Sequence, residues 1–133
     1  EYMTTDPISD MLTQIRNALA VRKPEVLLPY SKLKFSLATT LAKNGWLEQV
    51  GTEGDGYTKK LKLKLKYDGQ GQATISGLMR VSKPGQRIYT KAKTMPRVAL
   101  GNGVGIVSTS RGLMTSDEAR RAKLGGELIC QVW

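Results

Sequence analysis

Leucine and lysine alternate through residues 60–67, and this segment constrains the fold more than any other part of the sequence. Lys60, Lys62, Lys64 and Lys66 occupy the even positions, and Tyr67 closes a row of three leucines on the odd positions. Because successive side chains of a strand point to opposite faces, a period of two fits only a half-buried β-strand. The lysine face has two interpretations, which stay open: it contacts phosphate, or it is a solvated sheet face whose lysines discourage edge-to-edge aggregation.

Two segments before this strand carry the signals of amphipathic helices. Asp6 is a good N-cap, Pro7 suits the first helical position, and apolar residues then recur at helical spacing through residue 19. Ser31 is expected to cap a second helix that ends at residue 44, with Gly45 after it. Strands are expected at residues 26–28, 46–50, 60–67 and 73–81. This order predicts two helices on one face of a small sheet.

Glycines punctuate short apolar runs after residue 82, and only one further helix is expected, at about residues 116–123. Thr115 and Glu118 have the spacing of a capping box that would start it. We therefore predict an α+β fold of two small domains. Residues 1–82 would form an N-terminal α/β sandwich, and residues 83–133 a mainly β C-terminal domain with one short helix.

The charge of the chain points to a polyanionic partner. The net charge is +10; residues 1–72 hold 11 basic and 8 acidic residues, whereas residues 73–133 hold 10 and 3. The shorter part therefore has the stronger positive field, as expected of a nucleic-acid-binding region.

Two absences restrict the chemistry. The chain has no histidine, which excludes Ser-His-Asp and Cys-His triads and every histidine-containing metal site. The single cysteine, Cys130, cannot form an internal disulfide, and its apolar surroundings predict a core residue. No apolar run reaches the length of a membrane span and no signal peptide is recognisable, so we expect an intracellular protein.

The segment Ser108-Thr109-Ser110-Arg111-Gly112 is the most unusual loop candidate. Short hydroxyls lose little rotamer entropy and can meet base edges, 2′-hydroxyls and phosphates. The alternative is a turn in which the hydroxyls satisfy their own backbone. A nucleophilic serine would need a base other than histidine, which leaves only a Ser-Lys dyad.

Two further glycine-containing segments each allow a functional and a structural interpretation. Lys83-Pro84-Gly85 has the residue order of a type II turn. Arg87 and Tyr89 follow on alternate positions of the next strand. They are either a phosphate contact beside a stacking ring or part of an ordinary hairpin. The glycines of residues 101–105 lead into an apolar strand pattern rather than a helix, so they favour a turn over a nucleotide-binding loop.

Five segments of the chain together resemble the ribosomal protein S8 family of the bacterial small subunit. They are DPISDMLTQIRNA at 6–18, SKLK at 31–34, RVSKPGQRIY at 80–89, GIVSTSRGLMT at 105–115 and GGELIC at 125–130. The resemblance covers nearly the whole chain, in order. The sequence departs from the family at two positions. Many relatives have aspartate directly after Met-Thr, whereas here Ser116 stands between Thr115 and Asp117. Gln86 stands where a second basic residue is common.

The resemblance implies a two-domain protein that binds the central domain of 16S rRNA and helps to organise and assemble the platform of the 30S subunit. By resemblance, the hydroxyl trio Ser108-Thr109-Ser110 would contact bases and sugars, and Arg111 would contact phosphate. Tyr89 would pack at the RNA surface beside a loop formed by residues 125–127. Lysines at the start of the second helix would add contacts with the RNA backbone. The expected RNA-binding residues are Ser108, Thr109, Ser110, Arg111, Tyr89, Arg87, Lys83, Ser82, Gly125, Gly126, Glu127, Lys32 and Lys34.

The resemblance also implies ribosomal proteins S5 and S12 as neighbours, a cytoplasmic ribosomal location, and a protein that is monomeric when free, needs no cofactor or metal and is not an enzyme. Two functions of other classes are the alternatives. A Ser-Lys hydrolase would label covalently at a serine, and a basic protein–protein adaptor would bind its partner independently of RNA.

Overall fold

The computed structural model describes residues 6–94 and 103–133 of the 133-residue chain. Their contacts divide the chain into two compact units, each with its own sheet. We call residues 10–76 the first unit, and residues 77–133 with the N-terminal residues up to Ser9 the second unit. The predicted turn at Gly101 and Asn102 lies outside the described residues.

The predicted caps of the first two helices are confirmed. In α1 (Pro7–Ala20), the Asp6 carboxylate accepts hydrogen bonds from the backbone N–H and the hydroxyl of Ser9, at 3.3 and 2.7 Å. In α2 (Lys32–Lys43), the Ser31 hydroxyl accepts the N–H of Lys34 at 3.2 Å. Both caps satisfy N–H groups that the first helical turn would otherwise leave unpaired.

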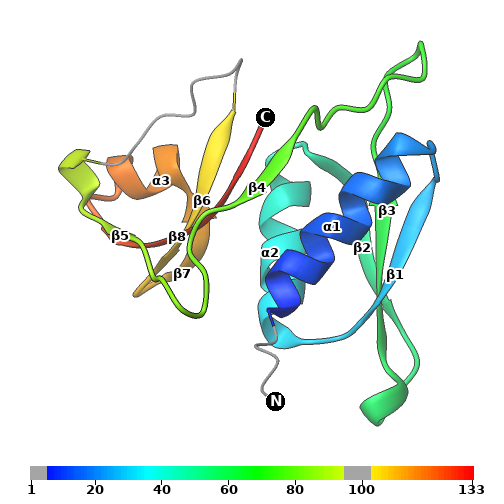
Figure 1. The fold of residues 1–133 in the computed structure, drawn as a ribbon, viewed down its shortest axis with the longest axis horizontal. Coiled ribbons are helices and arrows are strands. Elements are labelled where there is room, and N and C mark those ends of the chain that lie inside the picture. Colours follow the sequence, from blue (N-terminus) through cyan, green and yellow to red (C-terminus); the bar gives the residue numbers. More distant parts are fainter. Residues whose placement is uncertain (1–5, 95–102) are drawn as a thin grey trace. The chain divides into compact units, whose positions relative to one another are not determined.

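The first unit contains an antiparallel sheet of β1 (Glu25–Pro29), β2 (Leu47–Glu53) and β3 (Lys60–Leu65), in the order β1-β3-β2, with a 3₁₀ turn at Gly56–Thr58. The three leucines of β3 are buried, as their spacing predicts. Figure 1 shows α1 and α2 on one side of this sheet. The lysines point to the other side, and because β3 is the central strand, the suggested role of its lysines in protecting a sheet edge is wrong.

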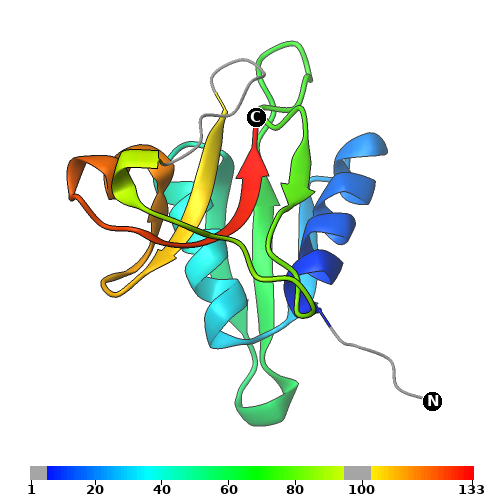
Figure 2. The same cartoon turned by 60° about the vertical axis from the view of Figure 1, so that its left-hand side comes forward.

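The second unit is mainly β. Its strands are β4 (Leu78–Arg80), β5 (Tyr89–Thr90), β6 (Val104–Thr109), β7 (Gly112–Thr115) and β8 (Gly126–Val132). Strand β8 pairs antiparallel with β4, β5 and β6, and β6 pairs with β7, so β8 organises the sheet (Figure 2). The predicted third helix, α3 (Ser116–Arg121), has the expected capping box between Thr115 and Glu118; a 3₁₀ turn lies at Ala92–Thr94.

The strand predicted at residues 73–81 within the first domain is wrong in its length and in its partner. Ala73 makes only an isolated bridge to Tyr67 after the turn, and β4 covers residues 78–80 and pairs with β8. Backbone hydrogen bonds in both directions between Gly77 and Trp133 extend that pairing. The partner lies some fifty residues further along the chain, so no local pattern could identify it.

The predicted core position of Cys130 is confirmed. Its side chain is fully buried, and burial raises the pKa of the thiol to about 12. Within the described segments, no helix is long and apolar enough to cross a membrane, and no group of three or more His, Cys, Asp or Glu residues could hold a metal ion.

Candidate nucleic-acid interface

Several residues that the sequence analysis singled out form one row across the sheet of the second unit. In the strand register, Tyr89 of β5 is opposite Glu127 of β8, Glu127 is opposite Ser108 of β6, and Ser108 is opposite Leu113 of β7. Directly paired residues of antiparallel strands point to the same face. The row therefore gathers a ring, a carboxylate and a hydroxyl from three chain segments on one side of the sheet.

The other side of this sheet is occupied by the core. Val107 and Leu128, each next in sequence to a member of the row, are buried and pack with Ala119 of α3. Met114 packs against the same cluster. Because neighbouring residues of a strand alternate between faces, the row of Tyr89 and Ser108 points away from this core.

Two glycines allow the strands of the row to approach one another. A Cβ atom on Gly126 would collide with the carbonyl oxygen of Ser108, and one on Gly125 would lie 2.5 Å from the carbonyl oxygen of Thr90. Any side chain at either position would push β8 away from β6 or β5. Gly125 and Gly126 therefore fix the spacing of the row and offer little contact surface of their own.

Glu127 is held by a small polar network. Its carboxylate accepts a hydrogen bond from the Ser82 hydroxyl at 2.5 Å and pairs with the Arg87 guanidinium at 3.0 Å. The Ser82 hydroxyl in turn accepts the backbone N–H of Ile88 at 3.0 Å. Burial alone would raise the pKa of Glu127, but the hydrogen bonds from Ser82 and Arg87 and the charge of Arg87 lower it below its usual value.

Ser82 is fully buried and both donates and accepts within this network. We therefore assign it the role of positioning Glu127 and the chain at Ile88, rather than direct contact with a ligand. Arg87 is exposed but already paired with Glu127, so its charge is partly compensated on this surface.

The hydroxyl trio divides into three different environments. Ser108 is half-buried in the row. The Thr109 hydroxyl accepts the N–H of Arg111 at 3.1 Å and donates to the carbonyl of Gly112 at 2.9 Å, so it organises the turn, as the alternative interpretation of this segment had it. Ser110 and Arg111 are exposed at the tip of the turn.

Tyr89 and Lys83 give this surface an exposed ring and an exposed cation. Tyr89 is 71% exposed although it lies in the row. Lys83 lies at a tight turn that its backbone closes with Gln86. The turn is not of type II as predicted, because Gly85 lacks the positive φ that this type requires.

The two lysines expected at the start of the second helix belong to the first unit and differ in accessibility. Lys32 is exposed. Lys34 is only 9% exposed, and burial lowers the pKa of its ammonium. Lys32 is therefore the better candidate for a phosphate contact at the start of α2.

Sequence reasoning missed Leu113, which ends the row, and Thr90 and Lys91, which flank Gly125. Leu113 and Met114 are both apolar, so the alternation that would assign their faces is missing from β7. No short-range signal marks Thr90 and Lys91, because their closeness to Gly125 depends on the pairing of β5 with β8.

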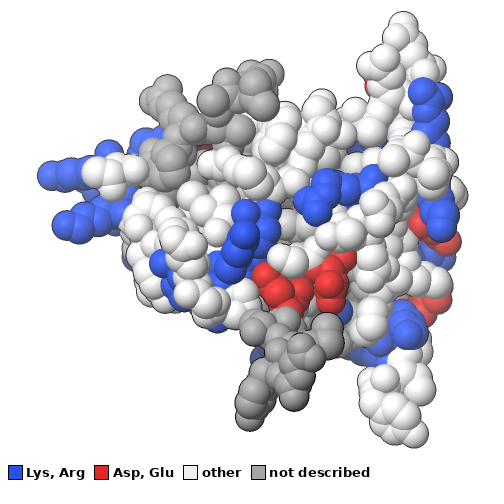
Figure 3. Space-filling view, viewed as in Figure 1, with Lys and Arg blue, Asp and Glu red and all other residues white. Residues whose placement is uncertain are grey.

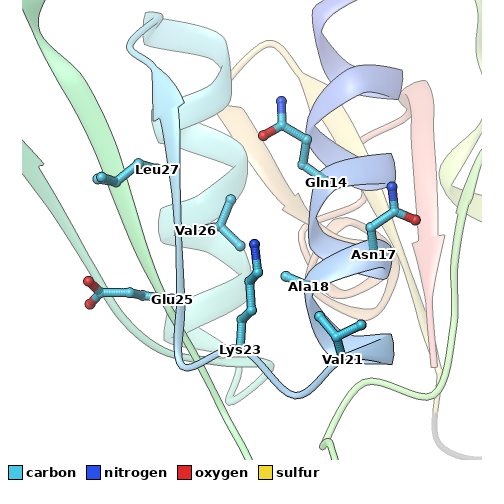
Figure 4. A pocket seen from close by; sticks show the side chains of 8 residues that line it. All are labelled: Gln14, Asn17, Ala18, Val21, Lys23, Glu25, Val26 and Leu27. Atoms are coloured by element: carbon cyan, nitrogen blue, oxygen red, sulfur yellow. The ribbon is translucent and has the colours of Figure 1, made fainter.

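The pocket between α1 and β1 offers no catalytic arrangement. Its eight lining residues include two amides from α1, Gln14 and Asn17, and two ionisable residues, Lys23 and Glu25 (Figure 4). In the space-filling view, basic side chains occur over both units, whereas acidic ones occupy fewer places on that face (Figure 3).

Comparisons with known proteins agree with this picture. The family model described as Ribosomal protein S8 matches residues 6–133. The chain is 51% identical over 129 residues to a protein named small ribosomal subunit protein uS8 from Caldanaerobacter subterraneus subsp. tengcongensis, which covers 97% of this chain and 98% of the relative. Proteins of the same name from Sorangium cellulosum and Synechocystis sp. are each 50% identical, and each match covers 98% of this chain and 100% and 98% of the relative, respectively.

Proposed function

The chain belongs to the ribosomal protein S8 family, and from this membership we propose that it binds the central domain of 16S rRNA through the row and the hydroxyl turn of its second unit. Family membership makes it a structural constituent of the small ribosomal subunit and not an enzyme. The RNA region, the contacting residues and their roles belong to the proposal.

One observation carries the proposal. Tyr89 and Ser108 lie on one side of a sheet whose other side is core, and the exposed Ser110–Arg111 turn follows at the end of β6. RNA sites of defined shape are recognised by stacking rings and by hydroxyls that meet base edges and 2′-hydroxyls. A rigid sheet with glycine-enforced spacing supports such recognition because the groups are ordered before the RNA arrives.

The residues of this surface divide into roles. Ser108 and Ser110 would contact bases and sugars, Arg111 and Lys83 would contact phosphates, and Tyr89 would pack against the RNA. Gly125, Gly126, Thr109, Ser82 and Glu127 would hold these groups in place, and Arg87 would do so as the partner of Glu127. Lys32 of the first unit, with Lys34 beside it, would add backbone contact.

Affinity would come chiefly from cations that neutralise phosphates and release counterions, so binding should fall steeply as salt increases. Selectivity would come from the hydroxyls and the ring, because phosphate contacts carry no sequence or shape information of their own. The same resemblance leads us to expect ribosomal proteins S5 and S12 as neighbours in the assembled subunit.

The test is binding of the full chain to a 16S central-domain fragment, with footprinting at several salt concentrations. We expect Ser110→Ala to weaken this binding by about 1–2 kcal/mol, as for the loss of one polar contact. Ser36→Ala, at an exposed serine of α2, is the matched control and should leave binding unchanged. An equal loss for an unrelated RNA duplex would contradict the role of Ser110 in selectivity.

Arg111→Ala separates charge from shape. We expect it to reduce the slope of log affinity against log salt by about one phosphate contact for every RNA tested. An unchanged slope would exclude a phosphate contact at this position.

A further inference from the structure

The lysine face of the first unit is not used by the proposed site, although it is the most regular cationic feature of the chain. Lys60, Lys62 and Lys64 lie on the face of β3 opposite to its buried leucines, in the centre of the three-stranded sheet. Because β3 is central, protection of a sheet edge does not explain them. Three like charges on one strand face repel one another, so the arrangement needs another reason.

Acidic side chains compensate only the middle lysine. Lys62 pairs with Glu25 of β1 at 3.6 Å and with Glu53 of β2 at 3.3 Å. Both acids therefore turn toward the same cation. Among the described residues, no ion pair joins Lys60 or Lys64 to an acidic side chain, and both lysines are exposed.

The face is also hollowed beside Lys62. A Cβ atom on Gly51, which is opposite Lys62 in the register, would meet no atom within 4 Å. A hollow there is lined by Glu25, Gln49, Gly51, Lys62 and Lys64. A ligand could thus approach the backbone of the sheet between the flanking lysines.

The cations continue from the stripe to the start of α2. Burial lowers the pKa of Lys34, and the charge of Lys60 lowers it further, although the charge of Asp10 acts in the opposite direction. The Lys59 ammonium lies 4.1 Å from the centre of the Tyr30 ring, just before α2. Lys32 is exposed at the first turn of α2. The start of α2 and the Lys60 end of the stripe therefore form one cationic surface.

We infer that the lysine face of β3 is a second, shape-independent RNA site, on which Lys60 and Lys64 hold the phosphates of one strand that leads away from Lys32 at the start of α2. This inference rests on the proposed function, because it extends the contact surface of an rRNA-binding protein. Four residues of a strand span about 13 Å, so the two lysines would hold phosphates that are not adjacent. Although Glu25 is opposite Lys64 and Glu53 is opposite Lys60 in the register, both carboxylates form their ion pairs with Lys62.

The face suits a phosphate backbone better than an acidic protein partner. Protein interfaces depend on a buried apolar or aromatic anchor. Among the large apolar residues of these three strands in the described chain, only Leu27 is exposed. A row of cations beside an open glycine instead suits the electrostatic, sequence-independent contact that lysines make with phosphates.

The experiment compares two double variants of the full chain that lose the same charge. Lys60→Gln with Lys64→Gln removes the unpaired cations of the stripe, whereas Lys23→Gln with Lys43→Gln removes two exposed lysines outside β3. Each is titrated with poly(U) and with the 16S central-domain fragment over a series of salt concentrations. The stripe variant should bind both RNAs severalfold more weakly at low salt, with a slope smaller by about 1.4 for the single strand, at about 0.7 for each phosphate contact.

Equal salt slopes for the two double variants on poly(U) would overturn the inference, because the stripe would then act only through net charge. A loss of poly-glutamate binding in the stripe variant, with RNA binding unchanged, would overturn it in favour of an acidic protein. The poly(U) arm does not depend on recognition of the central domain. Failure of the proposed function would instead appear as equal affinity of the unaltered chain for the central-domain fragment and an unrelated RNA.

Discussion

The exposed faces of the two sheets are built in opposite ways. In the first unit, the lysine face comes from the six residues of β3, and only its middle cation is paired with acids on the neighbouring strands. In the second unit, the row combines residues from four strands, held by close glycines and by a hydroxyl–carboxylate–guanidinium network in which Ser82 is buried. One face is a pattern of charge on a regular strand, and the other is a packed arrangement of polar groups.

The difference teaches which kind of binding each face can support. Exposed lysines on flexible stems adapt to any phosphate backbone and cost the fold little. A row held by close strand approach can favour one RNA shape, but it makes the stability of the second unit depend on a few atoms. Substitutions should therefore affect folding strongly in the row of the second unit and weakly on the lysine face of the first unit.

The largest expected effect is at a glycine. Gly126→Ala places a Cβ against the carbonyl oxygen of Ser108, which only a backbone shift can relieve. We expect the free energy of unfolding to fall by about 3 kcal/mol or more, measured by urea denaturation. Binding of the central-domain fragment should be lost with it, because Ser108 moves out of the row.

Gly51→Ala is the matched change in the first sheet. A Cβ there meets no atom within 4 Å, and the backbone is not in the left-handed region. Because glycine weakens a strand interior, alanine should raise the free energy of unfolding by up to about 1 kcal/mol. If both variants were equally tolerated, the contrast between a packed and an open face would be wrong.

Ser82→Ala comes next. The substitution removes the donor to Glu127 and the acceptor for the N–H of Ile88 at a fully buried position. We expect a loss of about 2 kcal/mol in the free energy of unfolding, typical of buried polar groups left without partners. Ser36→Ala on the exposed face of α2 serves as the control, and a similar loss there would contradict the importance of the network.

Much of the first unit could be predicted from sequence because its signals are local. The Ser31 cap and the alternation of β3 each lie within a few residues, and the structure has them where expected. The Asp6 cap, whose residues belong to the second unit, is equally local. The α+β fold and the capping box at Thr115 followed from signals of the same kind.

The row of the second unit could not be predicted from local sequence signals alone. The hydroxyl segment was visible, but the separate environments of Ser108, Thr109 and Ser110 depend on the pairing of β6 with β7 and β8. Resemblance to the family placed Ser82 and Glu127 among the candidates, yet only the fold reveals that one is buried and positions the other. For the same reason β4 was assigned to the wrong sheet, since its partner is at the end of the chain.

The dependence of stability on pH offers a third, smaller contrast. Although burial opposes it, the hydrogen bonds and the charge around Glu127 lower its folded pKa below the ordinary value of 4.5. Its contribution to stability is therefore fully present above the pKa of the unfolded chain and is lost as the pH falls through the lower, folded value. Urea denaturation from pH 7 to pH 3 should show a flatter decline for Glu127→Gln than for the unaltered chain.

Asp6 acts in the same direction and provides an internal check. Although burial would raise the pKa of Asp6, hydrogen bonds from Ser9 and Arg80 lower it, so part of the acid-induced loss should persist in Glu127→Gln. An identical pH profile for the variant and the unaltered chain would show that the Glu127 network contributes nothing to folding.

The smallest effect should come from the ion pairs of the lysine face. Lys62 is exposed and lies between Glu25 and Glu53, and hydrogen bonding to Glu53 raises its pKa. Exposed pairs gain little in water because solvent and salt screen them and because two flexible side chains must be held in place. Glu53→Gln should therefore leave the urea midpoint unchanged within error, while freeing part of the Lys62 charge and increasing affinity for poly(U) at low salt. A lowered midpoint with unchanged RNA binding would reverse the comparison, since the charges of the first sheet would then serve the fold rather than a ligand.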